Sequence, residues 1–257
     1  MSDDLARAYA MEARFDERLC TRREAFAFGT AYFDEHHRDR YVSNFLRADT
    51  HLVEATPEAL MAAADELLGA AGYAHRMVCV CDAARGDAMR PAFMAAGYTA
   101  DPIVLMVLRR GADRAGVVDV AEVPFERARP VIHETYRRDD RLTGVVEQFT
   151  DQHGHYERAV GARFFLGSIG GEPAGVCELW VDGPDALVEH VDTLEEFRDR
   201  GVARSVVLAA VQAAKDARAE RIFIAADEND WPKELYGRLG FDRLGREWDF
   251  IRWPTPS

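Results

Sequence analysis

Hydrophobic and polar positions along this chain predict strands and helices that follow one another in two similar series. The elements expected in the first half are a helix over 1–20, a hairpin of 24–34 and 40–46, strands over 51–55, 77–81 and 98–110, and helices over 57–71 and 86–96. Those expected in the second half are strands over 117–123, 163–167, 173–182, 187–194, 221–226 and 241–253, and helices over 124–138, 145–160, 202–219 and from 231. This succession predicts an α/β (α+β) fold.

A repeat links the two halves. The segment 76–82 (RMVCVCD) resembles 221–227 (RIFIAAD), and 93–98 (FMAAGY) resembles 236–241 (YGRLGF). The two spacings differ by two residues, and this difference falls in the intervening loop, where a change of length is inexpensive. We therefore predict two copies of one fold, joined near the polar segment 111–116, with domain bounds of 1–112 and 113–257.

The second copy contains a pattern typical of an anion-binding loop. A strand over 187–194 leads into Arg198-Asp199-Arg200-Gly201-Val202-Ala203, and a long apolar-faced helix follows. The first amides of a helix have no internal acceptor and lie at the positive end of its dipole, so a phosphate can bind there if no side chain intervenes. Gly201 and Ala203 keep that position open, and three arginines, at 198, 200 and 204, add positive charge.

A second pattern follows this loop. Asn229 precedes Tyr236 by seven positions, and the Tyr is followed by x-x-x-Gly240-Phe241. Together, residues 187–241 resemble motifs A and B of the general-control-related N-acetyltransferase (GNAT) superfamily, with both motifs in the correct order. The resemblance implies two tandem domains, each with a mixed, mostly antiparallel sheet flanked by helices, and acetyl-CoA as co-substrate.

The resemblance also assigns roles to individual residues. It places the pyrophosphate of acetyl-CoA on 198–204, the pantetheine amides on the backbone of 191–193, and Asn229 near the arm of the cofactor. The expected cofactor-binding residues are Val191, Asp192, Thr193, Arg198, Asp199, Arg200, Gly201, Val202, Ala203, Arg204 and Asn229. Tyr236 is the expected general acid, which protonates the departing thiolate.

The general base is less well defined by the sequence. Glu189 lies two and four positions before Val191 and Thr193, so strand alternation predicts that all three share one face. We expect Glu189 to deprotonate the amine, directly or through water, and Glu178 on the neighbouring strand is the alternative. Each carboxylate is also compatible with a purely structural role.

The first copy lacks the anion-binding pattern. At the corresponding loop it carries Glu54-Ala55-Thr56-Pro57-Glu58, which has no glycine, carries acidic residues and includes a proline without an amide hydrogen. Phe93 occupies the position of Tyr236 and has no hydroxyl. We therefore predict a vestigial GNAT-like first domain and a catalytic second domain.

The two helices expected over 124–160 form part of the acceptor wall in the family. Their polar candidates, each also explicable as a solvated or capping side chain, are His133, Tyr136, Asp139, Asp140, His153, His155 and Tyr156.

Composition narrows the class of partner. The net charge of −13 argues against nucleic-acid binding, and no apolar run is long enough for a membrane helix. The N-terminus has no secretory pattern, so we expect a cytoplasmic protein. Cys79 and Cys81, in an apolar strand, are interpreted as core residues, and no metal is predicted.

The preferred function is acetyl transfer to a primary amine of a small molecule or a protein. The alternatives are a non-catalytic acyl-CoA-binding or regulatory protein on the same fold, and a structural α/β protein without a CoA site. The sequence leaves open whether the protein is a monomer or a homodimer.

Overall fold

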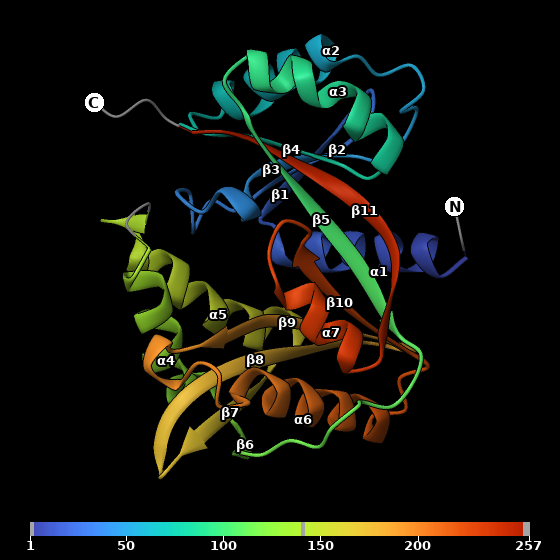
Figure 1. Ribbon diagram of the computed structural model, residues 1–257. Coiled ribbons are helices and arrows are strands. Elements are labelled where there is room, and N and C mark those ends of the chain that lie inside the picture. Colours follow the sequence, from blue (N-terminus) through green and yellow to red (C-terminus); the bar gives the residue numbers. More distant parts are fainter. Residues whose placement is uncertain (1–2, 140–141, 254–257) are drawn as a thin grey trace. The chain divides into compact units, whose positions relative to one another are not determined.

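The structure is a computed structural model that describes residues 3–139 and 142–253 (Figure 1). The chain divides into two compact units. The first unit comprises Met1–Leu105, Ala226–Asp230 and Leu244–Ser257, and the second comprises Met106–Ala225 and Trp231–Arg243. The chain first passes from one unit to the other between residues 105 and 106, whereas the sequence placed the domain boundary at 112. Neither unit is one continuous stretch of sequence.

The first unit begins with helix α1 (Asp3–Leu19) and contains a sheet in the strand order β1-β2-β3-β4-β11-β5. Its elements are β1 (Arg22–Phe26), β2 (Gly29–Phe33), β3 (Phe45–Ala48), α2 (Pro57–Ala64), β4 (Arg76–Val80), α3 (Ala83–Ala95), β5 (Thr99–Leu108) as far as Leu105, and β11 (Phe241–Arg252) from Leu244. The pairs β1–β2, β2–β3 and β4–β11 are antiparallel, and β3–β4 is parallel. A short 3-10 turn (Tyr41–Ser43) precedes β3, and a π-helical turn (Asp65–Gly69) extends α2.

Strand β11 is the main topological difference from the sequence-based expectation. The segment 241–253 was predicted to close the second copy, yet its later part pairs with β4, with Asp249 opposite Cys79 and Trp248 opposite Val80. The aromatic rings of Phe93 on α3 and Phe250 on β11 are stacked with centroids 4.1 Å apart. The last strand of the chain is therefore part of the first unit's core.

The second unit contains the strand order β10-β9-β8-β7-β6. Its elements are β6 (Asp119–Val123), α4 (Phe125–Arg137), α5 (Val146–Val160), β7 (Arg163–Ile169), β8 (Glu172–Asp182), β9 (Asp185–Thr193), a 3-10 turn (Glu195–Phe197) labelled η4, α6 (Val202–Asp216), β10 (Arg221–Asp227) as far as Ala225, and α7 (Pro232–Arg238). Strands β6 to β9 are antiparallel neighbours, and β9 pairs with β10 in parallel.

Helices cover both faces of this sheet. A Cβ added at Gly175 on β8 would lie 2.6 Å from Val202 on α6, so α6 packs closely on the face to which Gly175 belongs. Trp180, an odd number of positions further along β8, points to the opposite face, where its ring lies 4.8 Å from that of Tyr156 on α5. The expected Gly170-Gly171 turn is confirmed, with both residues in the left-handed region.

Two local predictions are wrong. The segment 24–34 is two strands, because the chain turns at 27–28 and Gly29 allows the backbone to approach Arg47 more closely than any side chain would permit. The segment 51–55 is a turn, closed by a hydrogen bond from the Glu54 amide to the His51 carbonyl, and His51 has a φ of 48°. Among the described residues, no helix combines the length and apolarity needed to cross a membrane.

Candidate functional site

Helix α6 begins without a side-chain cap. Gly201 is its N-cap and has a φ of 81°, and no side-chain hydrogen bond caps the helix at this residue. A Cβ at Gly201 would approach Val117 Cγ2 to 2.5 Å, so both backbone conformation and packing favour glycine here. Asp199, two positions earlier, also has a positive φ, of 61°. The loop thus curves sharply into a helix start whose first amides have no intrahelical acceptor.

The chain before β6 is held against this helix start by Ser205. Its hydroxyl donates to the Gly201 carbonyl at 2.9 Å and accepts from the amides of Val117 and Val118 at 2.9 and 3.3 Å. Ser205 is almost fully buried, so these amides have a specific partner away from water. One serine therefore fixes both the approaching segment and the first turn of α6.

The three arginines of the loop have different surroundings. Arg204 donates to Asp113 at 2.6 Å, so an ion pair already holds its guanidinium. Arg200 lies over the ring of Phe197, 5.7 Å from its centroid. The charge of Arg198 acts on Asp192 at the end of β9. Arg198 and Arg200 are therefore better placed than Arg204 to interact with a bound anion.

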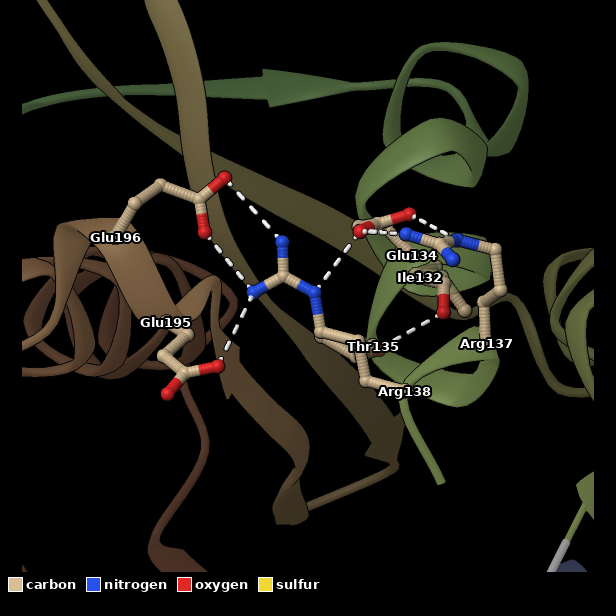
Figure 2. Close-up of polar contacts among 7 residues, drawn as sticks. All are labelled: Ile132, Glu134, Thr135, Arg137, Arg138, Glu195 and Glu196. Atoms are coloured by element: carbon tan, nitrogen blue, oxygen red, sulfur yellow. Dashed lines mark hydrogen bonds and ion pairs between the residues drawn. The ribbon is translucent and has the colours of Figure 1, made fainter. Parts of the chain in front are cut away.

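The turn η4 before this loop is anchored to helix α4 through Arg138. Figure 2 shows the guanidinium between Glu134 on α4 and the adjacent Glu195 and Glu196. The Nε atom donates to Glu134 at 2.9 Å, and Nη1 donates to Glu196 at 2.9 Å. These are exposed pairs, each of which contributes little alone, but one side chain links the two segments.

Strand β9 separates from its parallel neighbour β10 before the segment on which the resemblance places pantetheine. Residues Asp185 to Val188 of β9 pair with β10, and β9 continues beyond them to Thr193. Within the described part of the chain, the Thr193 hydroxyl is buried and has no hydrogen-bond partner. The backbone of 191–193 therefore forms an edge on which a ligand amide can pair.

A β-bulge in β9 overturns the predicted arrangement of Glu189. In the pairing with β8, Glu189 lies opposite Glu178 and Asp192 lies opposite Val176, so two residues of β9, at 190 and 191, match the single Cys177. The extra residue shifts the alternation. Glu189 therefore shares a face with Asp192, and not with Val191 and Thr193 as strand alternation had predicted.

The residue in this bulge is strained. His190 has a φ of 48°, which an L-residue other than glycine seldom adopts. Its ring centroid lies 4.4 Å from that of His153 on α5 and 5.8 Å from that of Tyr156. The bulge thus turns an imidazole toward the face that α5 covers.

On this face lies a buried hydrogen-bonded network. The Tyr136 hydroxyl lies 2.8 Å from Nε2 of His153, and Nδ1 of His153 is hydrogen-bonded to Glu178. The indole of Trp180 donates to the other oxygen of Glu178 at 2.8 Å. His153 and Glu178 are fully buried, whereas Tyr136 is partly exposed. The network therefore links a buried carboxyl group to a phenol that reaches the surface.

Negative charge is concentrated near Glu178. Burial and, to a smaller extent, the charge of Glu178 raise the pKa of Asp192 to about 6, against the opposing charge of Arg198. Glu178 accepts a hydrogen bond from the indole of Trp180 on one oxygen and contacts Nδ1 of His153 with the other, so both of its buried oxygens have hydrogen-bond partners.

The other expected residues are distributed more widely. Tyr236 lies on α7 in the second unit, 5% exposed, with its ring 6.4 Å from that of Phe241. Asn229 lies in the turn after β10, and residues 226–230 belong to the first unit.

The remaining residues expected in the acceptor wall have separate surroundings. His133 pairs with Glu147 at 3.0 Å on the surface, and the amide of Asp139 donates to the Tyr136 carbonyl. His155 is half-buried on α5. Asp140 lies outside the described residues.

Two groups of side chains in the described chain have donor atoms close enough to hold a metal ion. One is His153, Glu178 and His190, and the other is Cys79, Cys81 and Glu247 in the first unit. In the first group, both nitrogens of His153 and both oxygens of Glu178 already have protein partners. That group is therefore accounted for as a hydrogen-bonded network.

Comparison with known proteins agrees with this geometry. Residues 127–241 match the sequence model described as the acetyltransferase (GNAT) family. The matched segment includes all but the first two residues of α4, the helices α5 to α7, and all of the loop over 198–204. A search of curated proteins found no match to the sequence.

Solved structures resemble the chain over most of its length. A functionally unknown conserved protein from Staphylococcus epidermidis aligns with a TM-score of 0.67 at 15% identity, covering 90% of this chain and 93% of the other. A GCN5-related N-acetyltransferase from Kribbella flavida aligns at 0.62 and 14%, covering 98% and 96%. A tandem GNAT protein from the clavulanic acid biosynthesis pathway aligns at 0.55 and 18%, covering 90% and 80%. At these identities the likeness establishes the tandem GNAT fold.

Proposed function

We propose that this protein is an acetyl-CoA-dependent N-acetyltransferase that transfers an acetyl (acyl) group to a primary amine of a small molecule or a protein. The observation that carries the proposal is the helix start at Gly201. Its N-cap residue has a left-handed backbone conformation and no side-chain cap, and it follows, after the turn η4 and a short loop, a strand that has separated from its parallel neighbour. This combination suits a long ligand that has an anionic diphosphate at one end and amides along its arm.

The donor would bind along β9 and the start of α6. The diphosphate would lie on the amides of the loop 198–204, with Arg198 and Arg200 providing positive charge. The pantetheine amides would pair with the backbone of 191–193, and an amide hydrogen there would stabilise the oxyanion of the tetrahedral intermediate. We retain Asn229 as a contact of the cofactor arm on the basis of the family resemblance.

Transfer requires the amine to lose a proton as its nitrogen attacks the thioester carbon. We propose that the Tyr136–His153–Glu178 network accepts this proton. The Glu178 carboxylate can hold Nδ1–H of His153, which leaves Nε2 free to accept from Tyr136, so a proton can pass inward from the partly exposed phenol. Glu189, which lies directly opposite Glu178 on β9, remains the alternative base, alone or through water.

The carbon–sulfur bond breaks when the tetrahedral intermediate collapses, and the leaving thiolate then needs a proton. We assign this general-acid step to Tyr236 on α7, whose position in the sequence matches the family pattern.

The first unit would not bind acetyl-CoA in the same way. The corresponding helix, α2, starts at Thr56, whose side chain accepts from the Ala59 amide at 3.2 Å, and Pro57 follows with no amide hydrogen. Glu58 adds negative charge in the first turn. We therefore propose that the first unit is a vestigial copy with a structural or substrate-shaping role.

The proposal is tested by following release of free coenzyme A thiol from acetyl-CoA over a panel of primary amines and amine-bearing peptides. We expect at least one acceptor to give thiol release that depends on both enzyme and acceptor, with an acetylated amine detected by mass spectrometry. Saturable acetyl-CoA binding without thiol release from any acceptor would instead favour a regulatory acyl-CoA-binding protein.

A further inference from the structure

The first unit contains a second chemically unusual cluster, which the proposed acetyl transfer does not use. Strands β4 and β11 are antiparallel, with Asp249 directly opposite Cys79. Continuing this register brings Glu247 opposite Cys81, and their Sγ and Oε2 atoms lie 3.7 Å apart. Two thiols and two carboxyl groups therefore face the same side of the sheet.

The distances in this cluster match those of a tetrahedral zinc site. The sulfurs of Cys79 and Cys81 lie 3.8 Å apart. With zinc–sulfur bonds of about 2.3 Å and a zinc–oxygen bond of about 2.1 Å, a tetrahedral site places two sulfurs about 3.8 Å apart and a sulfur and an oxygen about 3.6 Å apart. The positions of Cys79, Cys81 and Glu247 therefore need little change to hold an ion.

Asp249, opposite Cys79 on the same face of the sheet, is the residue that we propose as the fourth donor. Within the described part of the chain its Oδ1 atom is buried and has no hydrogen-bond partner. The donor atoms of Cys79, Cys81 and Glu247 all lie within 4.8 Å of one another, and Asp249 is the residue directly opposite Cys79. A buried carboxylate oxygen without a partner is unfavourable, and a bound cation removes this penalty.

The local charge balance also favours a cation. Arg47 on β3 is nearly fully buried and forms ion pairs with Glu12, Asp16 and Asp49 at 3.0, 3.5 and 3.8 Å. The single guanidinium of Arg47 is therefore already shared among three carboxyl groups. The carboxyl groups of Glu247 and Asp249 add two further acids to the three that already contact Arg47. Helix α1 packs near β11 beside this cluster, because the Tyr9 hydroxyl donates to the Arg246 carbonyl at 3.2 Å.

We propose that Cys79, Cys81, Glu247 and Asp249 form a structural zinc site in the first unit. Binding releases the two thiol protons and leaves a closed set of four protein ligands, the arrangement typical of structural and not catalytic zinc. The ion fastens β11, the last strand of the chain, to β4. The sequence-based interpretation of Cys79 and Cys81 as simple core residues did not include the two acids, because they lie about 170 positions away in the chain.

The test is zinc stoichiometry of the full-length protein, purified without a histidine tag and dialysed against excess Zn²⁺ and then buffer. We expect about one zinc per chain by mass spectrometry of the metal. Replacement of Zn²⁺ by Co²⁺ should give a near-ultraviolet thiolate-to-cobalt absorption band. Less than about 0.2 equivalents of zinc per chain would overturn the proposal. Bound cobalt without the thiolate band would also overturn it, and would indicate that the metal is held by His153, Glu178 and His190.

Variants then assign the ligands. Cys79→Ser and Cys81→Ser should each lose the bound zinc, and Cys20→Ser, which removes a thiol outside the cluster, should retain it. Glu247→Gln keeps the side-chain shape and should weaken zinc binding at least tenfold. Circular dichroism identifies any variant that fails to fold, and Glu247→Gln provides the test if both serine variants do. Unchanged zinc affinity in folded Glu247→Gln would contradict the site.

Discussion

The phenolic oxygen of Tyr136 lies 2.8 Å from Nε2 of His153, although the two residues are on different helices, α4 and α5. The opposite ring nitrogen of His153 contacts Glu178, so hydrogen bonds constrain both sides of the imidazole. A carboxylate that holds Nδ1–H fixes the tautomer in which Nε2 is an acceptor. This relationship gives the proposed base a defined direction of proton transfer, from the partly exposed phenol inward.

We expect His153→Gln to lower kcat by roughly 10²–10⁴-fold while leaving the Kd for acetyl-CoA nearly unchanged, because general-base catalysis is of this size and the donor contacts lie elsewhere. The acidic limb of the kcat/KM–pH profile should change with it. The comparison is His133→Gln on the neighbouring helix, whose ring pairs with Glu147 at the surface. Equal kcat values and pH profiles for the two variants would assign the base to Glu189 or water.

For Tyr236→Phe we predict a kcat lowered by roughly 10²–10⁴-fold with little change in acetyl-CoA affinity, since only the proton donor to the thiolate is removed. Steady-state thiol release and calorimetric titration measure the two quantities. Tyr98→Phe, which removes a buried hydroxyl in the first unit, serves as the matched control. If Tyr236→Phe turns over as fast as this control, the thiolate takes its proton from another group.

Gly201→Ala should weaken acetyl-CoA binding at least tenfold. The substitution adds a methyl group at a φ of 81°, which destabilises the protein by about 1–2 kcal/mol, and it places that methyl beside the helix amides. Gly183→Ala, at a φ of 59°, introduces comparable backbone strain but has no neighbour within 4 Å, whereas the methyl at Gly201 would also displace Val117. Thermal denaturation and calorimetric titration separate the effects. Should both variants bind acetyl-CoA like the wild type, the loop does not hold the diphosphate.

Asp192 should make the protein less stable as the pH rises through the acidic range. Its pKa is raised to about 6 in the folded state from 3.8, so between these values the folded protein holds a proton that the unfolded chain has lost. The free energy of unfolding therefore falls with rising pH over this interval, by at most about 3 kcal/mol. Urea denaturation at pH 4 and pH 7 should show a smaller decline for Asp192→Asn. Parallel declines in the two proteins would refute this effect.

The sequence predicted the features that depend on local pattern. The helix and strand order around 187–241 is confirmed because apolar periodicity and the glycine at 201 act over a few residues. The Thr56-Pro57 helix start is confirmed for the same reason. The residues matched to the GNAT family also include Gly201 and Tyr236, on which the resemblance depended.

The remaining features depend on contacts that local pattern does not encode. Apolar alternation in 241–253 specifies a strand but not its neighbour, so its pairing with β4 could not be read from it. The bulge at His190 is a single extra residue with no distinctive sequence, and it reverses the face expected for Glu189. Glu178 did carry a signal, an acid within the apolar run AGVCELWV, but its partner His153 lies on a helix 25 residues away.

The most direct test of the account is a crystal structure of the protein with coenzyme A. We predict one cofactor per chain, with its diphosphate on the amides that follow Gly201 and its pantetheine along 191–193. An empty site beside Gly201 at saturating ligand, or a cofactor bound at the Thr56-Pro57 helix start of the first unit, would contradict it.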